Sequence, residues 1–299
     1  MKSISIKRLP VLAGILLFTS VAGAYAAETK IEGVLFANYS VMTSHWKATS
    51  VRAYGYNAFN VGRAYVTAST KYTPNITSKI VLEASSSSAG NAAFLKNAFL
   101  QWKDDTGKFT VEGGMQGTLW IGAEEVVWKY RFVEKVQADL EGVLTSADKG
   151  VKVIYKLPKG FGTAEAMLAN GEGYNALENT DYKGYGKDEQ IRLSLTPIPG
   201  FKEFSVSGLY LGSVFLPRTR ERFVGGVAYQ GKKFSVGASM IKSLDYWTTY
   251  ASSSATIKQG YSVYGNLPVI SSLSIFSRLD NFDNSQLGIK KWDKKTLLI

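Results

Sequence analysis

The stretch KKFSVGASM, residues 232–240, alternates between apolar side chains and polar or small ones. Its apolar positions are Phe234, Val236, Ala238 and Met240. QIRLSLT (190–196) and SSLSIFSRL (271–279) follow the same two-residue period. Successive side chains of a β-strand point to opposite faces, so this period predicts strands with one apolar face and one polar face.

Similar runs recur from residue 31 onward, rich in Val, Ile, Tyr, Phe, Thr and Ser and separated by Gly, Asn, Asp and Pro. No helical apolar period is sustained over about ten residues. The sequence therefore predicts an all-β chain of about 14 strands. We place them at 31–41, 58–71, 76–84, 93–103, 107–115, 147–156, 161–169, 187–196, 202–211, 221–230, 232–242, 256–265, 270–280 and 294–299.

The connections between these runs alternate in length. YTPN (72–75) and DDTG (104–107) are short, whereas the connections at 42–57, 85–92 (SSSSAGNA), 116–146 and 170–186 are longer. Outer-membrane barrels sort their connections in this way, with short turns on the periplasmic side and long loops outside. The pattern predicts a transmembrane antiparallel β-barrel of about 14 to 16 strands. A soluble barrel or sandwich stays open as an alternative, because periodicity does not say which face points inward.

The N-terminal segment has the organisation of a secretory signal peptide. Lys2, Lys7 and Arg8 precede an apolar stretch over 9–24, and Ala24-Tyr25-Ala26 forms a small-x-small cleavage site. We therefore expect a signal peptide at 1–26 and a barrel domain at 27–299. A membrane anchor is the alternative, but the apolar stretch is shorter than the roughly 20 residues that a spanning helix needs.

The composition argues against most catalytic and metal sites. The 299 residues include one His and no Cys. Disulfides, thiolate metal sites and Cys nucleophiles are thus excluded. A lone His45 makes a Ser-His-Asp relay or a multi-histidine metal centre improbable. We expect no catalytic residue, no metal and no cofactor.

The net charge of +11 comes from basic residues that are spread along the chain. Nucleic-acid-binding domains show a basic stripe or a recognisable motif, and neither is present. We therefore expect no nucleic-acid partner. Small anionic or polar solutes and lipid headgroups fit this charge better.

Three stretches resemble the phosphate-selective porin O/P family and its porin-like relatives. They are FNVGRAYVTASTKY (59–72), LWIGAEEVVWKYRFVEK (119–135) with SADKGVKV (146–153), and ANGEGY (169–174). The resemblance covers about 31–175 well and the remainder only through the general strand pattern. It implies a pore in the outer membrane, in contact with outer-membrane lipids and assembled as a homotrimer. It also implies passage of small hydrophilic solutes, with a preference for anions in some members.

Two features depart from this family. Its selective members have 16 strands, and further strands within 116–146 or 170–186 would raise our count. The last run, 294–299, is short, whereas crossing a membrane takes about 9 to 11 residues. We therefore expect that the sequence is truncated at its C-terminus.

The connection at 116–146 is the third long loop, and in general porins, as in the resembled family, this loop folds inward and narrows the lumen. Charges of both signs across a narrow lumen create a transverse field that selects and orients solutes. The alternative is a packed plug, in which the aromatic residues bury against the wall and Arg131 pairs with a glutamate to hold the loop. Both can hold together. The candidate constriction residues are Trp120, Glu124, Glu125, Trp128, Lys129, Tyr130, Arg131, Glu134 and Lys135.

Several basic residues have the inward parity of their strands, and Glu83 is the one clear acidic residue on that parity. They predict a lumen with a positive potential that concentrates anions. Arg63 shares its parity with Phe59 and Val61, so either a bulge intervenes or the lumen is partly aromatic. The basic residues that lie near turns have a second interpretation, in which they are in water at the periplasmic rim. The predicted lumen cations are Arg63, Lys79, Lys152, Lys156, Arg192, Arg222, Lys233, Lys258 and Arg278.

The sequence thus favours an outer-membrane porin, a passive diffusion channel with a weak preference for anions, phosphate among them. One rival is an outer-membrane barrel enzyme, a protease or phospholipase, which would need Ser, His and Asp or Glu at one rim. The other rival is a non-conducting surface or structural barrel, which would have a sealed lumen of bulky side chains.

Overall fold

The computed structural model describes residues 27–41, 57–87, 90–171, 173–174, 186–198, 200–215, 218–248, 253–270, 273–286 and 292–298. The expected signal peptide at 1–26 and His45 lie outside the described residues.

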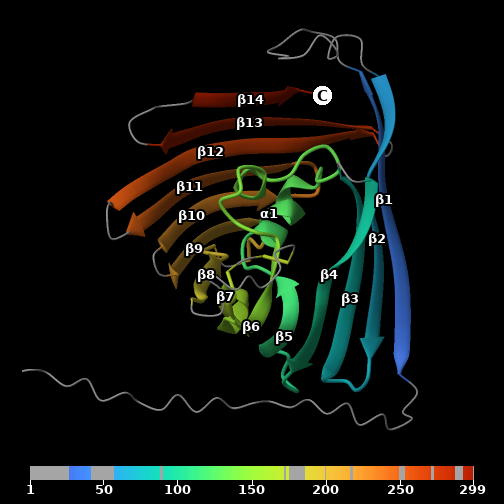
Figure 1. The fold of residues 1–299 in the computed structure, drawn as a ribbon. Helices are drawn as coiled ribbons and strands as arrows, with labels where there is room; N and C mark the ends of the chain where they lie inside the picture. The colour runs from blue at the N-terminus through green and yellow to red at the C-terminus, as the bar shows by residue number, and fades with distance from the viewer. Residues whose placement is uncertain are drawn as a thin grey trace, which may run out of the picture.

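The described chain folds into one sheet of 14 strands, arranged in the order of the sequence. Each strand pairs antiparallel with the next, and the sheet curves around a central space that we call the lumen (Figure 1). The strands are β1 (Glu28–Val41), β2 (Asn57–Lys71), β3 (Ile76–Ser87), β4 (Gly90–Lys103), β5 (Phe109–Gly117), β6 (Ala147–Lys156), β7 (Gly162–Ala169), β8 (Asp188–Leu195), β9 (Phe204–Phe215), β10 (Arg218–Gln230), β11 (Ser235–Thr248), β12 (Ser253–Ile270), β13 (Leu273–Gln286) and β14 (Trp292–Leu298).

Each predicted run coincides with one of these strands, which confirms the antiparallel all-β fold. At the end with long loops, several strands run further than expected. β9 ends at Phe215 and β10 begins at Arg218, where we had predicted a loop over 212–220. Backbone pairing between neighbouring strands continues there beyond the alternating apolar pattern. Polar residues that we assigned to loops therefore belong to the ends of strands.

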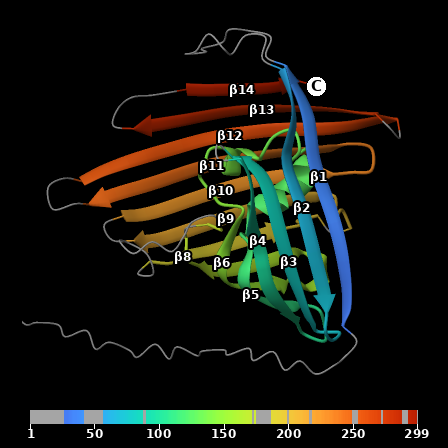
Figure 2. The ribbon, with the colours of Figure 1, turned by 45° about the vertical axis from the view of Figure 1, so that its right-hand side comes forward.

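Among the described residues, no ladder joins β14 to β1, so the sheet is not closed. Figure 2 shows β1 and β2 standing across one end of the strands β8 to β14. Within the same residues, no helix is long and apolar enough to cross a membrane.

The outer face of the sheet is apolar. Ile31, Ile191 and Met240 expose 72%, 61% and 71% of their surface, and each occupies an outward position of its strand. Exposed apolar surface spread around a whole sheet is unusual in a soluble monomer. The alternation of KKFSVGASM therefore places its apolar residues outside, as a barrel in lipid requires.

A bulge in β2 resolves the mixed parity around Arg63. Pairing with β1 shifts register at Gly62, between Val61 and Arg63. Phe59 and Val61 lie outside, with 88% and 51% exposed, whereas Arg63 turns inward and donates from Nη1 to Tyr65 Oη at 3.1 Å. Both parts of the expectation hold, since a bulge intervenes and the lumen carries an aromatic residue.

The residues between β5 and β6, 118–146, fold into the lumen, and we call them the inner loop. They contain α1 (Ile121–Trp128) and the short α2 (Gln137–Leu140), so this segment adds helices rather than further strands. In Figure 1, α1 lies inside the curved sheet, and it contacts β10, β11 and β12.

The inner wall beneath the inner loop is apolar, contrary to the predicted polar inward face. Inward side chains of β7 and of β9 to β13 form one core with Leu119, Trp120, Ile121 and Trp128 of the inner loop. The wall residues in this core are Met167, Ala169, Leu209, Leu211, Val224, Ile241, Tyr264, Phe276 and Phe282. Apolar residues at inward positions thus mark where the inner loop docks.

Gly162 sits where two strands approach closely, and it has a φ of +132°. A Cβ there would lie 1.8 Å from the Ser194 carbonyl oxygen on β8. We expect Gly162→Ala to destabilise the folded barrel by at least about 2 kcal/mol, through overpacking and backbone strain. Urea unfolding of the refolded protein in detergent measures this. Gly208→Ala is the control, because a Cβ at Gly208 meets nothing within 4 Å, and equal midpoints for the two variants would contradict the prediction.

Candidate constriction site

Trp128 anchors the inner loop to the wall. Its side chain is 1% exposed, and its ring makes edge-to-face contacts with Tyr130, Tyr264 and Phe276 at 5.5, 5.7 and 5.7 Å. The indole Nε1 donates to the Glu134 carbonyl oxygen at 2.8 Å. Edge-to-face pairs add about 0.5–1.5 kcal/mol each to the burial of their surface. The expected burial of aromatic residues against the wall is therefore present.

Arg278 of β13 fastens the same region. It is 2% exposed, its guanidinium lies 5.2 Å from the Trp128 ring centre, and its Nη1 donates to the Lys135 carbonyl oxygen at 2.5 Å. Its Nε donates to Asp280 at 2.9 Å. Arg278 has the predicted inward position, but its charge is compensated and buried under the inner loop, so it does not present a free cation to solutes.

Two more side chains tie the inner loop to wall strands. Gln137 Nε2 donates to the carbonyl oxygens of Tyr261 and Asn281, both at 3.1 Å. Arg222 of β10 donates from Nε to the Val143 carbonyl oxygen at 3.1 Å. Arg222 also pairs with Asp245 at 2.8 Å, so this predicted lumen cation too is buried and compensated.

The other predicted aromatic and basic residues of the inner loop divide between wall and solvent. Tyr130 stacks on Phe276 with ring centres 3.8 Å apart, and Trp120 Nε1 donates to Glu124 at 2.7 Å. Lys129 ends α1 in a left-handed conformation with φ 66° and points into solvent.

The face of the inner loop turned away from this wall carries charges of both signs. Arg131 Nε lies 2.5 Å from Glu125 Oε1, and its Nη2 lies 3.3 Å from Asp139. Lys135 Nζ lies 3.2 Å from the other oxygen of Asp139. Arg131 thus pairs with a glutamate, as expected for a packed plug. It also lies on a face with charges of both signs, as expected for a pore.

The opposite wall carries a compact basic cluster on β2, β3 and β4. Glu83 is 1% exposed, forms an ion pair with Arg63 at 2.9 Å and accepts a hydrogen bond from Lys96 at 2.9 Å. The Lys96 ammonium also lies 4.8 Å from the Tyr65 ring centre. Two cations share one carboxylate here, so the cluster carries a surplus of positive charge.

The two charged groups face each other across a gap of about 370 Å³, lined in part by Phe36, Arg63, Arg131 and Lys135. Burial raises the pKa of Glu125, while the charges of Arg131, Lys96 and Arg63 favour its ionised form. The basic cluster of the wall therefore acts electrostatically on an acid of the inner loop. Charges of both signs on the two sides of a lumen are the arrangement that creates a transverse field in a channel.

Glu124 lies on the wall side of α1 and is 5% exposed. It accepts hydrogen bonds from Trp120 Nε1 at 2.7 Å and from Tyr264 Oη at 3.4 Å. Burial raises the pKa of the Glu124 carboxyl above its usual range, and these contacts offset only part of that effect. A buried carboxyl without a close cation favours its neutral form.

This shift makes stability depend on pH. Because the pKa of Glu124 is higher in the folded protein, stability falls as pH rises from the unfolded pKa through the folded pKa. Glu124→Gln removes the ionisation, and we expect it to raise the unfolding midpoint at pH 8 but not at pH 4. The gain is about 1.4 kcal/mol for each unit of pKa shift. Urea unfolding in detergent at both values measures it, and a difference independent of pH would contradict the assignment.

Two further predicted lumen cations are also paired. Lys152 of β6 lies 2.7 Å from Glu112, and Arg192 of β8 lies 2.7 Å from Glu165. In both cases the strand register sets the two residues directly opposite each other. Cross-strand pairs of opposite charge stabilise a sheet. These acids reduce the positive potential that the basic residues alone predicted.

The remaining predicted cations make no ion pair with another described residue. Lys79 and Lys258 have inward positions on β3 and β12, and Lys156 ends β6, exposed to solvent. Lys233 lies in the turn between β10 and β11, outside the strand that we predicted for it. The rim interpretation therefore fits Lys156 and Lys233.

Sequence reasoning missed two inward cations and most inward acids. Lys96 reaches the lumen because the β3–β4 register shifts between Val81 and Leu82, which parity cannot show. Arg220, which pairs with Asp188 at 2.6 Å, fell in a predicted loop. The signal for the acids was present, since Glu165 has inward parity in GTAEAMLA.

Within the described residues, no group of His, Cys, Asp and Glu is suited to hold a metal.

Comparison with known proteins supports the fold. No protein-family model and no curated protein matches the chain. In-vitro folded OmpT of Vibrio cholerae, in its trimer form, aligns over 91% of this chain and 82% of its own, at 12% identity and a TM-score of 0.59. The anion-selective porin from Comamonas acidovorans aligns over 90% and 83%, at 10% identity and a TM-score of 0.61. Salmonella typhi OmpF in complex with daunomycin aligns over 91% and 86%, at 12% identity and a TM-score of 0.57.

At these identities the likeness establishes the fold alone. The chain has the fold of an integral outer-membrane β-barrel, and the porin fold implied by the resemblance is confirmed. Membership of the phosphate-selective family is not confirmed by these matches.

Proposed function

We propose that this protein is a porin of the outer membrane, a passive diffusion channel for small hydrophilic solutes with a weak preference for anions. The observation that carries the proposal is the docked inner loop. It is fixed to one wall by Trp128 and Arg278, and its charged face, which carries Glu125 and Arg131, is separated by a gap from Arg63 of the basic cluster. Opposed charges at a narrow point filter and orient polar solutes during diffusion.

The preference for anions is weak because most inward cations are compensated. Glu112 and Glu165 each neutralise one cation, whereas Glu83 serves both Arg63 and Lys96. The surplus of charge at the last cluster favours anions, and phosphate belongs to the solutes to be tested.

We further propose that the channel assembles as a homotrimer. The trimer form of the structurally similar OmpT supports this. Chemical crosslinking of the membrane-embedded protein tests it, since a trimeric product is expected and an exclusively monomeric pattern would overturn it.

Planar-bilayer recording under a gradient of KCl tests the function. We expect stepwise conductance and a reversal potential that shows modest anion selectivity. Cation selectivity would overturn the anion preference, and a correctly folded protein without conductance would overturn the pore. Added phosphate should carry current in place of chloride if phosphate is a solute.

A further inference from the structure

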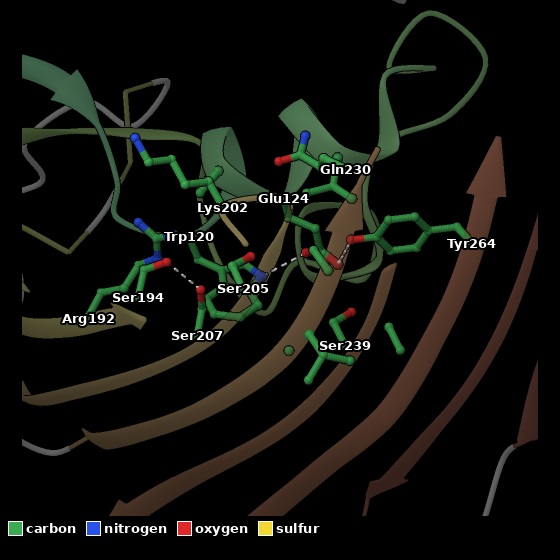
Figure 3. Close-up of a pocket in the computed structure, with 16 residues that line it drawn as sticks. Trp120, Glu124, Arg192, Ser194, Lys202, Ser205, Ser207, Gln230, Ser239 and Tyr264 are labelled. Carbon is green, nitrogen blue, oxygen red and sulfur yellow. Dashed lines mark hydrogen bonds between the residues drawn. The ribbon is translucent and has the colours of Figure 1, made fainter. Parts of the chain in front are cut away.

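A second cavity lies between α1 and the inner face of the wall (Figure 3). Its volume is about 250 Å³. Trp120 and Val127 line it on the helix side, and Gly226 and Ala228 of β10 line it on the wall side. Small side chains at these wall positions keep the space open beneath the helix.

One side of the cavity is a group of serine hydroxyls from neighbouring strands. Ser207 of β9 and Ser194 of β8 are hydrogen-bonded at 2.9 Å, and Ser205 lies two residues before Ser207 on β9 (Figure 3). Hydroxyls both donate and accept hydrogen bonds. This side can therefore exchange hydrogen bonds with a hydroxylated molecule.

Two cations complete the lining. Arg192 is held through Nη1 by Glu165 at 2.7 Å, while its buried Nε has no hydrogen-bond partner among the described residues. Lys202 lies exposed in the turn before β9, at the mouth of the cavity. One carboxylate stands against these two cations, which leaves a surplus of one positive charge. Glu124 also lines the cavity, and burial raises the pKa of its carboxyl.

We propose that this cavity binds a small hydroxylated monocarboxylate on its way through the pore. The carboxylate meets Lys202 and the free Nε of Arg192, while the hydroxyls of the solute meet Ser194, Ser205 and Ser207. The proposal rests on the proposed function for the arrival of the solute. It goes beyond that function in naming a subsite and a solute class.

Size and charge select this class. Pockets for drug-sized ligands measure about 300–1,000 Å³, so a cavity of about 250 Å³ suits a solute of a few carbon atoms. A surplus of one positive charge matches a monoanion better than a dianion such as hydrogen phosphate. A neutral polyol would leave the buried Arg192 Nε without a charged acceptor, and bonds to charged groups are the stronger ones.

Titration calorimetry on the protein refolded in detergent tests the proposal, with glycerate, glycerol and inorganic phosphate as probes. We expect glycerate to bind with a Kd on the order of 1 mM and each of the other two to bind about tenfold more weakly. Phosphate binding more tightly would overturn the assignment to a monocarboxylate. Equal binding of glycerol would overturn the role of the two cations.

A pair of matched variants locates the site. Ala228→Leu fills the cavity, whereas Ala166→Leu adds the same volume on β7, where Ala166 is exposed on the outer face. We expect the first variant to abolish glycerate binding and the second to retain it. The double variant Ser194→Ala/Ser207→Ala should weaken binding about tenfold, which corresponds to about 1.4 kcal/mol.

Calorimetry and conductance separate this inference from the proposed function. A protein that conducts but binds no glycerate overturns the subsite and leaves the porin proposal standing. A protein that binds glycerate without conducting overturns the porin proposal alone. Binding that survives in Ala228→Leu would place the glycerate elsewhere and overturn the subsite.

Discussion

Trp128→Ala is expected to release the inner loop and to raise the single-channel conductance. Trp128 is 1% exposed and contacts aromatic residues of β12 and β13. Truncation of a buried tryptophan to alanine costs about 3–5 kcal/mol, and this loss falls on the contact between helix and wall. Once undocked, the inner loop no longer holds Glu125 and Arg131 at the narrow point, so the lumen widens.

The measurement is planar-bilayer conductance, together with limited proteolysis of the refolded protein. We expect larger conductance steps and new cleavage within residues 118–146. Val126→Ala is the matched control on the same helix, because Val126 is 62% exposed and does not belong to the buried core. If Trp128→Ala conducts and resists cleavage like the control, docking does not set the width of the pore.

The strands were predictable from sequence because lipid and water impose opposite requirements on alternate residues. KKFSVGASM carries that alternation over its whole length, and β11 begins within it at Ser235. The apolar wall under the inner loop was not predicted, since Ile241 and Phe276 are inward residues that pack against protein rather than face water. A period of two residues assigns a side chain to a face, but it cannot show what covers that face.

The candidate site was predictable in its segment and only partly in its charges. The place of 116–146 as the third long loop, together with the resemblance to porins, pointed to a loop inside the lumen. The pairing of Lys152 with Glu112 depends on the register between β5 and β6, which no single strand reveals. The inward position of Lys96 depends on a bulge in the β3–β4 ladder. Sequence parity found most of the basic residues of the lumen and Glu83, and it missed Lys96, Arg220 and most of the compensating acids.

Glu83→Gln is expected to shift the channel strongly toward anion selectivity. Glu83 is the shared acceptor of Arg63 and Lys96, at 2.9 Å from each, on the wall opposite Glu125. Glutamine keeps the shape and removes the charge, so two cations face the narrow lumen without a carboxylate. Removing one partner of a buried ion pair costs about 3–5 kcal/mol of stability, so refolding at neutral pH must be checked first.

The reversal potential under a KCl gradient measures this shift. Glu32→Gln is the matched control, because it removes the same charge from β1, two strands away from β3 in the sheet, where Glu32 is 51% exposed and pairs with Lys30. Water screens charges at an exposed site far more than at a buried one, so the control should move the reversal potential less. Arg63→Gln should move it in the opposite direction. Equal shifts for Glu83→Gln and Glu32→Gln would mean that selectivity follows the total charge of the lumen and not the field at its narrow point.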